Sequence, residues 1–185
     1  MNKALHFTTS DPNDWSTPRP FFEELTSRWG PFALDVCALP HNAKCDTYYT
    51  PEINGLAQPW HGSVWCNPPY GHGHIPQWLA KAVEEIRAGR CTQAVFLVPS
   101  ATDTAWFHDF CVAHASAIVF IRNRLHFSNP ERTGRGSHPS MVVIFKPKSL
   151  DRHSPRWKTL VATESVRKGS REGPRRGPIQ RKLAL

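Results

Sequence analysis

One stretch of the sequence decides the fold: SVWCNPPYGHGHIPQWLAKAVEEIRAGRCTQAVFLVPS, residues 63–100. Its first four and last eight residues are apolar runs, which are typical of strands buried on both faces. Between them, residues 76–90 place Trp78, Leu79 and Ile86 on one face of a helix. A strand, a helix and a second strand in this order predict a parallel pair of strands joined by a crossover helix.

The segments on either side continue this alternation. Helices are predicted at residues 18–30 and 102–115, and short apolar runs predict strands at residues 32–38, 117–127 and 140–147. The pattern indicates an α/β fold with a mostly parallel sheet and helices on both faces. Because no helix separates the last two strands, we expect an antiparallel strand at one edge of the sheet.

Charge divides the chain into two parts. Residues 146–185 hold 12 Lys or Arg and 3 Asp or Glu, a net charge of +9, whereas residues 1–145 carry −1, which together give the +8 of the whole chain. We therefore predict a domain at residues 1–150 and a basic, disordered tail at residues 151–185 that binds polyanions. A merely solubilising terminus fits the same composition equally well.

Other classes of protein are disfavoured by composition. The start of the chain has no apolar stretch typical of a signal peptide, and no window resembles a membrane span. The five cysteines are scattered without a C-x-x-C pair, which favours reduced thiols over a disulfide framework or a zinc site. We expect no metal and no membrane partner.

The tetrapeptide NPPY, residues 67–70, follows the first buried strand of the opening stretch. In an open α/β sheet, ligands bind beyond the carboxyl ends of the strands. The Asn67 side-chain oxygen and the Pro68 carbonyl would supply two acceptors for an exocyclic amine, and Pro69 stiffens the turn. Tyr70 offers a flat face on which a base can stack. The alternative is an ordinary loop after a strand.

The sequence resembles the phage-type, Dam-like DNA N6-adenine methyltransferases over residues 15–147. The segments that carry the resemblance are DWSTPRPFF, FALDVCALPHNAKC, YYTPEINGLAQPW, VWCNPPY, QWLAKA, FLVPSATDTAWFH and RLHFSNP. The resemblance implies a Rossmann-like methyltransferase fold and methyl transfer from S-adenosylmethionine to the N6 amine of adenine in double-stranded DNA, with base flipping. It also implies phage origin and a location in the cytoplasm of a bacterial host.

The resemblance assigns roles to individual residues. Asn67 and the Pro68 carbonyl would bind the N6 amine, Pro69 would shape the turn, and Tyr70 would stack on the adenine. The cofactor would contact Thr17, Pro18, Asp35, Cys37, Ala38, Asp46 and Asn54. Among these, Asp35 would lie near the methionine end and Asn54 near the adenine, while Asp46 is the candidate to bind the ribose.

One feature departs from the family pattern. No Gly-rich turn follows Asp35, although such a turn usually lets the backbone approach the cofactor closely. Only 32 positions separate Asp35 from Asn67, too few for two full strand–helix units.

Basic residues near the end of the domain are the candidates for DNA contacts. They are Arg122, Arg124, Arg135 and His138, in or near the polar loop SNPERTGRGSHPS. An ordinary exposed loop is the alternative. Two other functions stay open: the same fold could methylate an RNA base or a protein amide, or the chain could be a non-catalytic DNA-binding relative. The recognition sequence and the oligomeric state cannot be read from the sequence.

Overall fold

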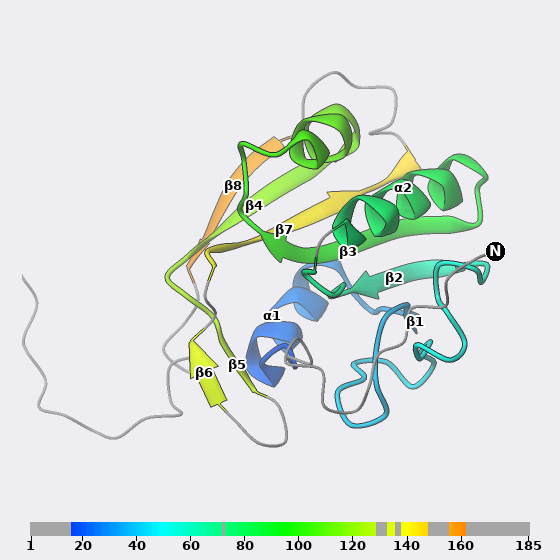
Figure 1. Cartoon of the computed structure of the whole chain (residues 1–185), viewed down its shortest axis with the longest axis horizontal. Coiled ribbons are helices and arrows are strands. Elements are labelled where there is room, and N and C mark those ends of the chain that lie inside the picture. Colours follow the sequence, from blue (N-terminus) through cyan, green and yellow to red (C-terminus); the bar gives the residue numbers. More distant parts are fainter. Residues whose placement is uncertain (1–15, 72, 129–132, 136–137, 148–155, 162–185) are drawn as a thin grey trace, which may run out of the picture.

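The computed structural model describes residues 16–71, 73–128, 133–135, 138–147 and 156–161 (Figure 1). The main elements are the helices α1 (Arg19–Trp29) and α2 (His74–Arg87), the π-helix η1 (Phe107–Val112), and the strands β1 (Leu34–Asp35), β2 (Gly62–Cys66), β3 (Cys91–Pro99), β4 (Ala117–Arg122), β5 (His126–Ser128), β6 (Thr133–Arg135), β7 (Ser140–Phe145) and β8 (Arg156–Val161). Each helix and strand predicted from the sequence has a counterpart among them.

The main sheet formed by the described residues has six strands in the order β1-β2-β3-β7-β4-β8. Strands β1, β2 and β3 are parallel, and β7 runs antiparallel to both of its neighbours, β3 and β4. The α/β class and the mostly parallel sheet are therefore confirmed.

The predicted place of the antiparallel strand is wrong, because β7 lies inside the sheet and not at its edge. The physical reason is burial. All six residues of β7 are buried, whereas β4 has partly exposed positions and ends on the exposed Arg122. A strand that is buried at every position needs partners on both sides and cover on both faces.

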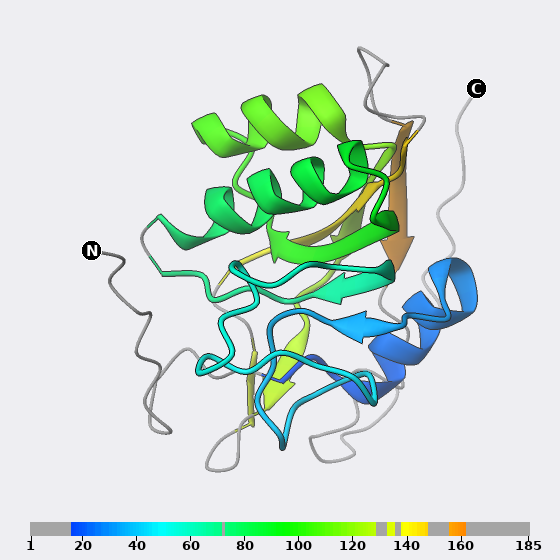
Figure 2. The same cartoon turned by 90° about the vertical axis from the view of Figure 1, so that its right-hand side faces the viewer.

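Helices cover both faces of the sheet, as predicted (Figure 2). On one face, Phe21, Phe22 and Leu25 of α1 pack against Trp65 and other strand residues. On the other face, α2 packs over β3 and against η1 through a cluster that includes Trp78 and Phe107. Helix α1 begins directly after Pro18, and so brings Ser16 and Thr17 to the sheet.

An irregular loop, residues 39–61, connects β1 to β2 and runs alongside β1. The backbone N–H of Asp35 donates to the Thr47 carbonyl at 3.0 Å, and the Tyr49 N–H donates to the Asp35 carbonyl at 2.9 Å. Gly55 lies so close to β1 that an added Cβ would stand 2.1 Å from the Val36 carbonyl oxygen. Gly55 thus lets this loop pack directly against the backbone that follows β1.

Strand β8 pairs in parallel with β4 from Arg156 to Val161. It lies beyond residue 150, where the sequence predicts that the domain ends, so the sheet includes part of the predicted tail. Residues 162–185 lie outside the described residues, and the disorder predicted for them stays a prediction.

Candidate active site

The candidate site lies at the carboxyl ends of β1 and β2. Asp35 is the last residue of β1 and pairs in register with Trp65 of β2. Asn67 lies two residues after Trp65, directly beyond the end of β2. Because side chains alternate along a strand, this register directs both polar side chains toward the α1 face of the sheet. They meet in one small cavity of about 30 Å³, the Asp35 pocket. Its lining residues are Ser16, Thr17, Asp35, Cys37, Asn42, Lys44, Trp65 and Asn67.

The Asp35 carboxyl is 2% exposed and fixed by backbone donors. The N–H of Cys37 donates to Oδ1 at 3.3 Å, and the N–H of Lys44 donates to Oδ2 at 3.0 Å. Burial raises the pKa of the carboxyl to about 7, although these N–H groups and the Lys44 charge act to lower it. A carboxyl of this kind is poised to ionise when a cation binds beside it.

Lys44 extends from the loop 39–61 to the segment before α1. Its Nζ donates to Ser16 Oγ at 3.0 Å. Partial burial lowers the pKa of the ammonium, and the nearby Asp35 carboxylate opposes that change. Ser16 is itself held by β5, because its N–H donates to the Ser128 carbonyl at 2.6 Å.

Asn67 and Tyr70 form a hydrogen-bonded pair. The Tyr70 hydroxyl donates to Asn67 Oδ1 at 2.9 Å and lies 3.3 Å from the Leu97 carbonyl oxygen of β3. Burial raises the pKa of the Tyr70 hydroxyl well above its usual range, so this group keeps its proton. The pair fixes Asn67 Oδ1, a side-chain acceptor, directly beyond the end of β2.

Comparison with known protein families gives a match over most of the chain. Residues 5–172 match the family described as DNA N-6-adenine-methyltransferase (Dam). The chain belongs to this Dam family. The resemblance carried by NPPY and its companion segments is therefore confirmed, and a methyltransferase requires a methyl donor.

Three individual proteins are similar to different shares of the chain. The DNA N-6-adenine-methyltransferase of Haemophilus phage HP1 (strain HP1c1) is 36% identical over 146 residues, which is 76% of this chain and 82% of the phage protein. The protein of the same name from Escherichia phage T1 is 35% identical over 109 residues, 58% of this chain and 44% of the T1 protein. Putative methyltransferase YfdM of Escherichia coli (strain K12) is 38% identical over 76 residues, 37% of this chain and 84% of that protein.

The structure brings together four of the residues that the Dam resemblance assigns to the site: Thr17, Asp35, Cys37 and Asn67. Three further cofactor candidates lie outside the lining of the Asp35 pocket. Pro18 caps α1, Ala38 is buried with its N–H on the Tyr49 carbonyl, and Asp46 is exposed.

Asn54 has a different local role. Its backbone has a positive φ of 57°, and its Oδ1 accepts from the Leu56 N–H at 3.3 Å, so the side chain stabilises its own turn. Asp46 as the ribose-binding acid and Asn54 beside the cofactor adenine stay predictions.

Sequence reasoning missed four lining residues: Ser16, Asn42, Lys44 and Trp65. Trp65 could have been found, because it precedes Asn67 by two positions and must therefore face the same side of the sheet. The positions of Asn42 and Lys44 depend on the path of an irregular loop, which no periodic pattern describes.

Three of the four basic candidates, Arg122, Arg124 and His138, lie at the same edge of the main sheet. Strand β4 runs parallel to β1–β3, so the exposed Arg122 at its end and the half-buried Arg124 beyond it follow a carboxyl end. Arg135 belongs to β6, which pairs with β5, and the exposed His138 precedes β7. A DNA contact by any of these residues stays a prediction.

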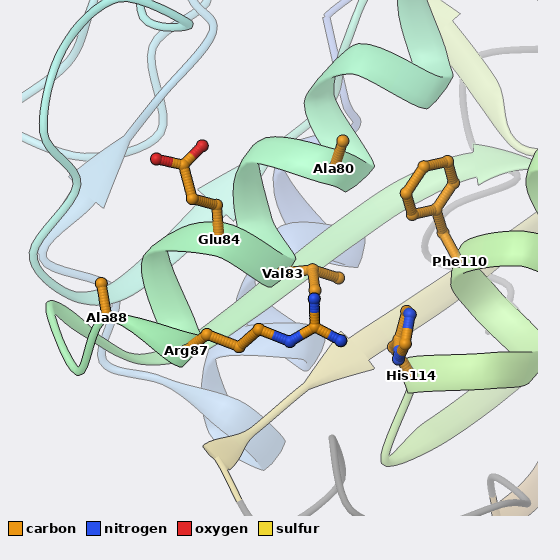
Figure 3. Close-up of a pocket in the computed structure, with 7 residues that line it drawn as sticks. All are labelled: Ala80, Val83, Glu84, Arg87, Ala88, Phe110 and His114. Atoms are coloured by element: carbon orange, nitrogen blue, oxygen red, sulfur yellow. The ribbon is translucent and has the colours of Figure 1, made fainter.

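A larger cavity, of about 490 Å³, lies elsewhere in the described part of the molecule (Figure 3). It is lined by the second half of α2, by Phe110 and by His114. Helix α2 begins near Tyr70 and runs for 14 residues, about 20 Å, back toward the amino ends of the strands. The cavity is therefore remote from Asn67 and does not belong to the site.

The described residues contain neither a metal-binding group nor a membrane-spanning helix. No group of three or more His, Cys, Asp or Glu side chains in the described residues could hold a metal ion. Among the same residues, no helix is long and apolar enough to cross a membrane.

Proposed function

We propose that the protein transfers a methyl group from S-adenosylmethionine to the N6 amine of adenine in double-stranded DNA. The observation that carries the proposal is that Asp35 and Asn67 line one pocket. In this arrangement, the residue assigned to the methyl donor and the residue assigned to the acceptor amine stand at neighbouring strand ends, as a direct transfer requires.

Asn67 would hold the target amine. Its Oδ1 is a side-chain acceptor positioned by the Tyr70 hydroxyl, and the Pro68 carbonyl would supply a second acceptor. Two acceptors at a fixed separation match the two hydrogens of an amino group and orient the nitrogen lone pair. Since an aryl amine is unprotonated at neutral pH, positioning rather than a strong base would provide much of the catalysis.

The Asp35 pocket fits the polar end of S-adenosylmethionine. The cofactor supplies an electrophilic methyl group on a sulfonium, and its methionine part carries an ammonium group. A buried carboxyl with a pKa of about 7 is a suitable partner for that ammonium, because the added positive charge favours the ionised acid. The pocket volume of about 30 Å³ suits a small polar group and not a nucleoside.

Double-stranded DNA would approach the carboxyl edge of the sheet. Arg122 and Arg124 follow β4 at this edge and would contact phosphates, and we assign Arg135 and His138 to the same surface. Because Asn67 is half-buried directly beyond a strand end, the target adenine would leave the stack to reach it, and Tyr70 would stack on the flipped base. We expect this reaction to take place in the bacterial cytoplasm, where phage DNA is replicated.

The test is incubation with labelled S-adenosylmethionine and plasmid DNA that lacks N6-methyladenine, followed by nucleoside chromatography. We expect label in N6-methyladenine with the wild-type protein and a strong loss with Asn67→Ala. Label in RNA or protein, but not in DNA, would favour methylation of another amino group. DNA binding without labelled product would favour the non-catalytic relative.

A further inference from the structure

The Asp35 pocket contains a second charge, to which the family resemblance assigns no role. The Lys44 backbone N–H is fixed on Asp35 Oδ2 at 3.0 Å, and its side chain reaches Ser16 Oγ, also at 3.0 Å. An ammonium group has three hydrogens to donate. Among the residues that the structure describes, no carboxylate lies within ion-pair distance of Lys44 Nζ. Its hydrogen-bond partner among these residues is the neutral hydroxyl of Ser16.

Asp35 and Lys44 therefore line one cavity without forming an ion pair with each other. Asp35 is buried to 2% exposure and Lys44 is half-buried. The cavity between them, about 30 Å³, holds roughly two or three water-sized polar groups. Charges that are partly removed from water cost free energy unless a partner of opposite sign compensates them.

We infer that Lys44, assisted by Ser16, binds the carboxylate of the methionine part of the cofactor while Asp35 binds its ammonium. The pocket is then a receptor for an α-amino-acid zwitterion, whose two charges are separated by a single carbon atom. This inference rests on the proposed function, because it needs S-adenosylmethionine as the ligand.

A different role for Lys44 makes a different prediction. If Lys44 only stabilised the Asp35 carboxylate, its loss would weaken every ligand that has the ammonium group, with or without a carboxylate. If Lys44 binds the carboxylate, its loss would weaken only ligands that have one. The two roles separate when ligands that lack one group at a time are compared.

The experiment is isothermal titration calorimetry of the full chain with three ligands. They are S-adenosylmethionine, decarboxylated S-adenosylmethionine, which lacks the carboxylate, and 5′-methylthioadenosine, which lacks the whole amino-acid end. We expect the wild-type protein to bind the first about 10- to 100-fold more tightly than the second, as is typical of a hydrogen bond to a charged group. In Lys44→Met, this preference should disappear, while affinity for 5′-methylthioadenosine stays the same.

Matched variants complete the design. Lys44→Arg should restore the preference for the carboxylate. Lys146→Met makes the same change in charge on an exposed residue directly after β7, near the amino ends of the parallel strands. It should leave all three affinities unchanged. If Lys44→Met fails to fold, Ser16→Ala provides the same comparison with a smaller expected loss of preference.

The outcomes are distinct. Equal weakening of S-adenosylmethionine and its decarboxylated form in Lys44→Met would overturn the inference and leave the proposed function standing. Failure of the folded wild-type protein to bind any of the three ligands would overturn the proposed function itself.

Discussion

At the scale of single residues, Asn67 carries the clearest prediction. Asn67→Ala should lower the single-turnover rate of methyl transfer by roughly 10²–10³, the typical cost of losing one preorganised polar contact in a transition state. Cofactor affinity should change little, because the amide is assigned to the base. Rapid-quench assays on saturating DNA, with calorimetry of the cofactor, measure both. A variant that methylates DNA at a near-normal rate would show that NPPY here is only a loop.

Tyr70 has two separable groups, a ring and a hydroxyl. Tyr70→Phe keeps the stacking face but removes the hydrogen bond to Asn67 Oδ1, so the methyl-transfer rate should fall by roughly 3- to 10-fold, the equivalent of about 0.5–1.5 kcal/mol. Tyr70→Ala should also weaken capture of the flipped base by roughly 1–3 kcal/mol. Fluorescence of a base analogue at the target position reports capture, and it should be normal in Tyr70→Phe. A loss of that signal in Tyr70→Phe would assign the hydroxyl to base capture.

Asp35 should make cofactor binding depend on pH. Burial raises its pKa to about 7, so below that pH the free protein holds a proton that must leave when an ammonium ligand binds. Affinity should therefore rise about tenfold per pH unit from about pH 5.5 to about pH 7 and then level off. The neighbouring Cys37 and Cys66 thiols do not titrate in this range, because burial raises the pKa of both. Calorimetry across this range with Asp35→Asn as the control should give a flat line, and the same slope in that variant would point to another group.

The sequence predicts the positions of residues that lie directly after a strand. Asn67 directly follows an apolar run, so its place at the carboxyl edge could be predicted from the local pattern alone, whereas Asp35 lies inside the run 32–38 and was assigned through the family resemblance. Lys44 lies nine residues after Asp35 in an irregular loop, and it reaches Ser16, 28 residues earlier in the chain. No local pattern contains a contact of that kind, which is why the second charge of the pocket was missed.

At the scale of elements, the loop 39–61 depends on Gly55. Gly55→Ala would place a Cβ 2.1 Å from the Val36 carbonyl oxygen, a backbone atom that cannot move without shifting β1. We expect a loss of about 1–3 kcal/mol in the free energy of unfolding, as for overpacking of a core, together with weaker cofactor binding. Urea denaturation and calorimetry measure these two effects.

A second glycine provides the control for that experiment. Gly89 has a positive φ of 72° but no atom within 4 Å of an added Cβ, so Gly89→Ala reports the backbone cost alone. Its cost should be about 1 kcal/mol, without an effect on the cofactor. Equal behaviour of the two variants would mean that the tight contact of Gly55 is easily relieved.

Strand order is the part of the fold that the sequence did not reveal. The run SMVVIF of β7 is apolar at every position after Ser140, which already favours a central position over an edge. The absence of a helix between β4 and β7 correctly predicts an antiparallel pair. It does not say that β7 also pairs with β3, because that contact joins segments more than 40 residues apart in the chain.

At the scale of the whole molecule, the basic C-terminal segment should control the salt dependence of DNA binding. Residues 162–185 carry 7 Lys or Arg and 2 Asp or Glu, so their deletion should weaken binding at low salt and flatten the salt slope while sequence preference is retained. Deletion of residues 151–185 should in addition destabilise the domain, since it removes β8 from the edge of β4. Fluorescence anisotropy across a salt series and thermal unfolding compare the two deletions. An unchanged salt slope after the shorter deletion would mark the segment as a solubilising terminus.

The inserted position of β7 also governs the order in which the protein can assemble during synthesis. A ribosome releases β3 and β4 well before β7, yet β7 is the strand that joins them. Until Phe145 has emerged, β3 lacks a partner on one side and β4 lacks a partner on both sides, and β3 is the longest strand of the sheet formed by the described residues. Unpaired edges of this kind readily pair with another chain. A translational pause before Ser140 would therefore be the moment at which newly made copies of this methyltransferase are most prone to aggregate.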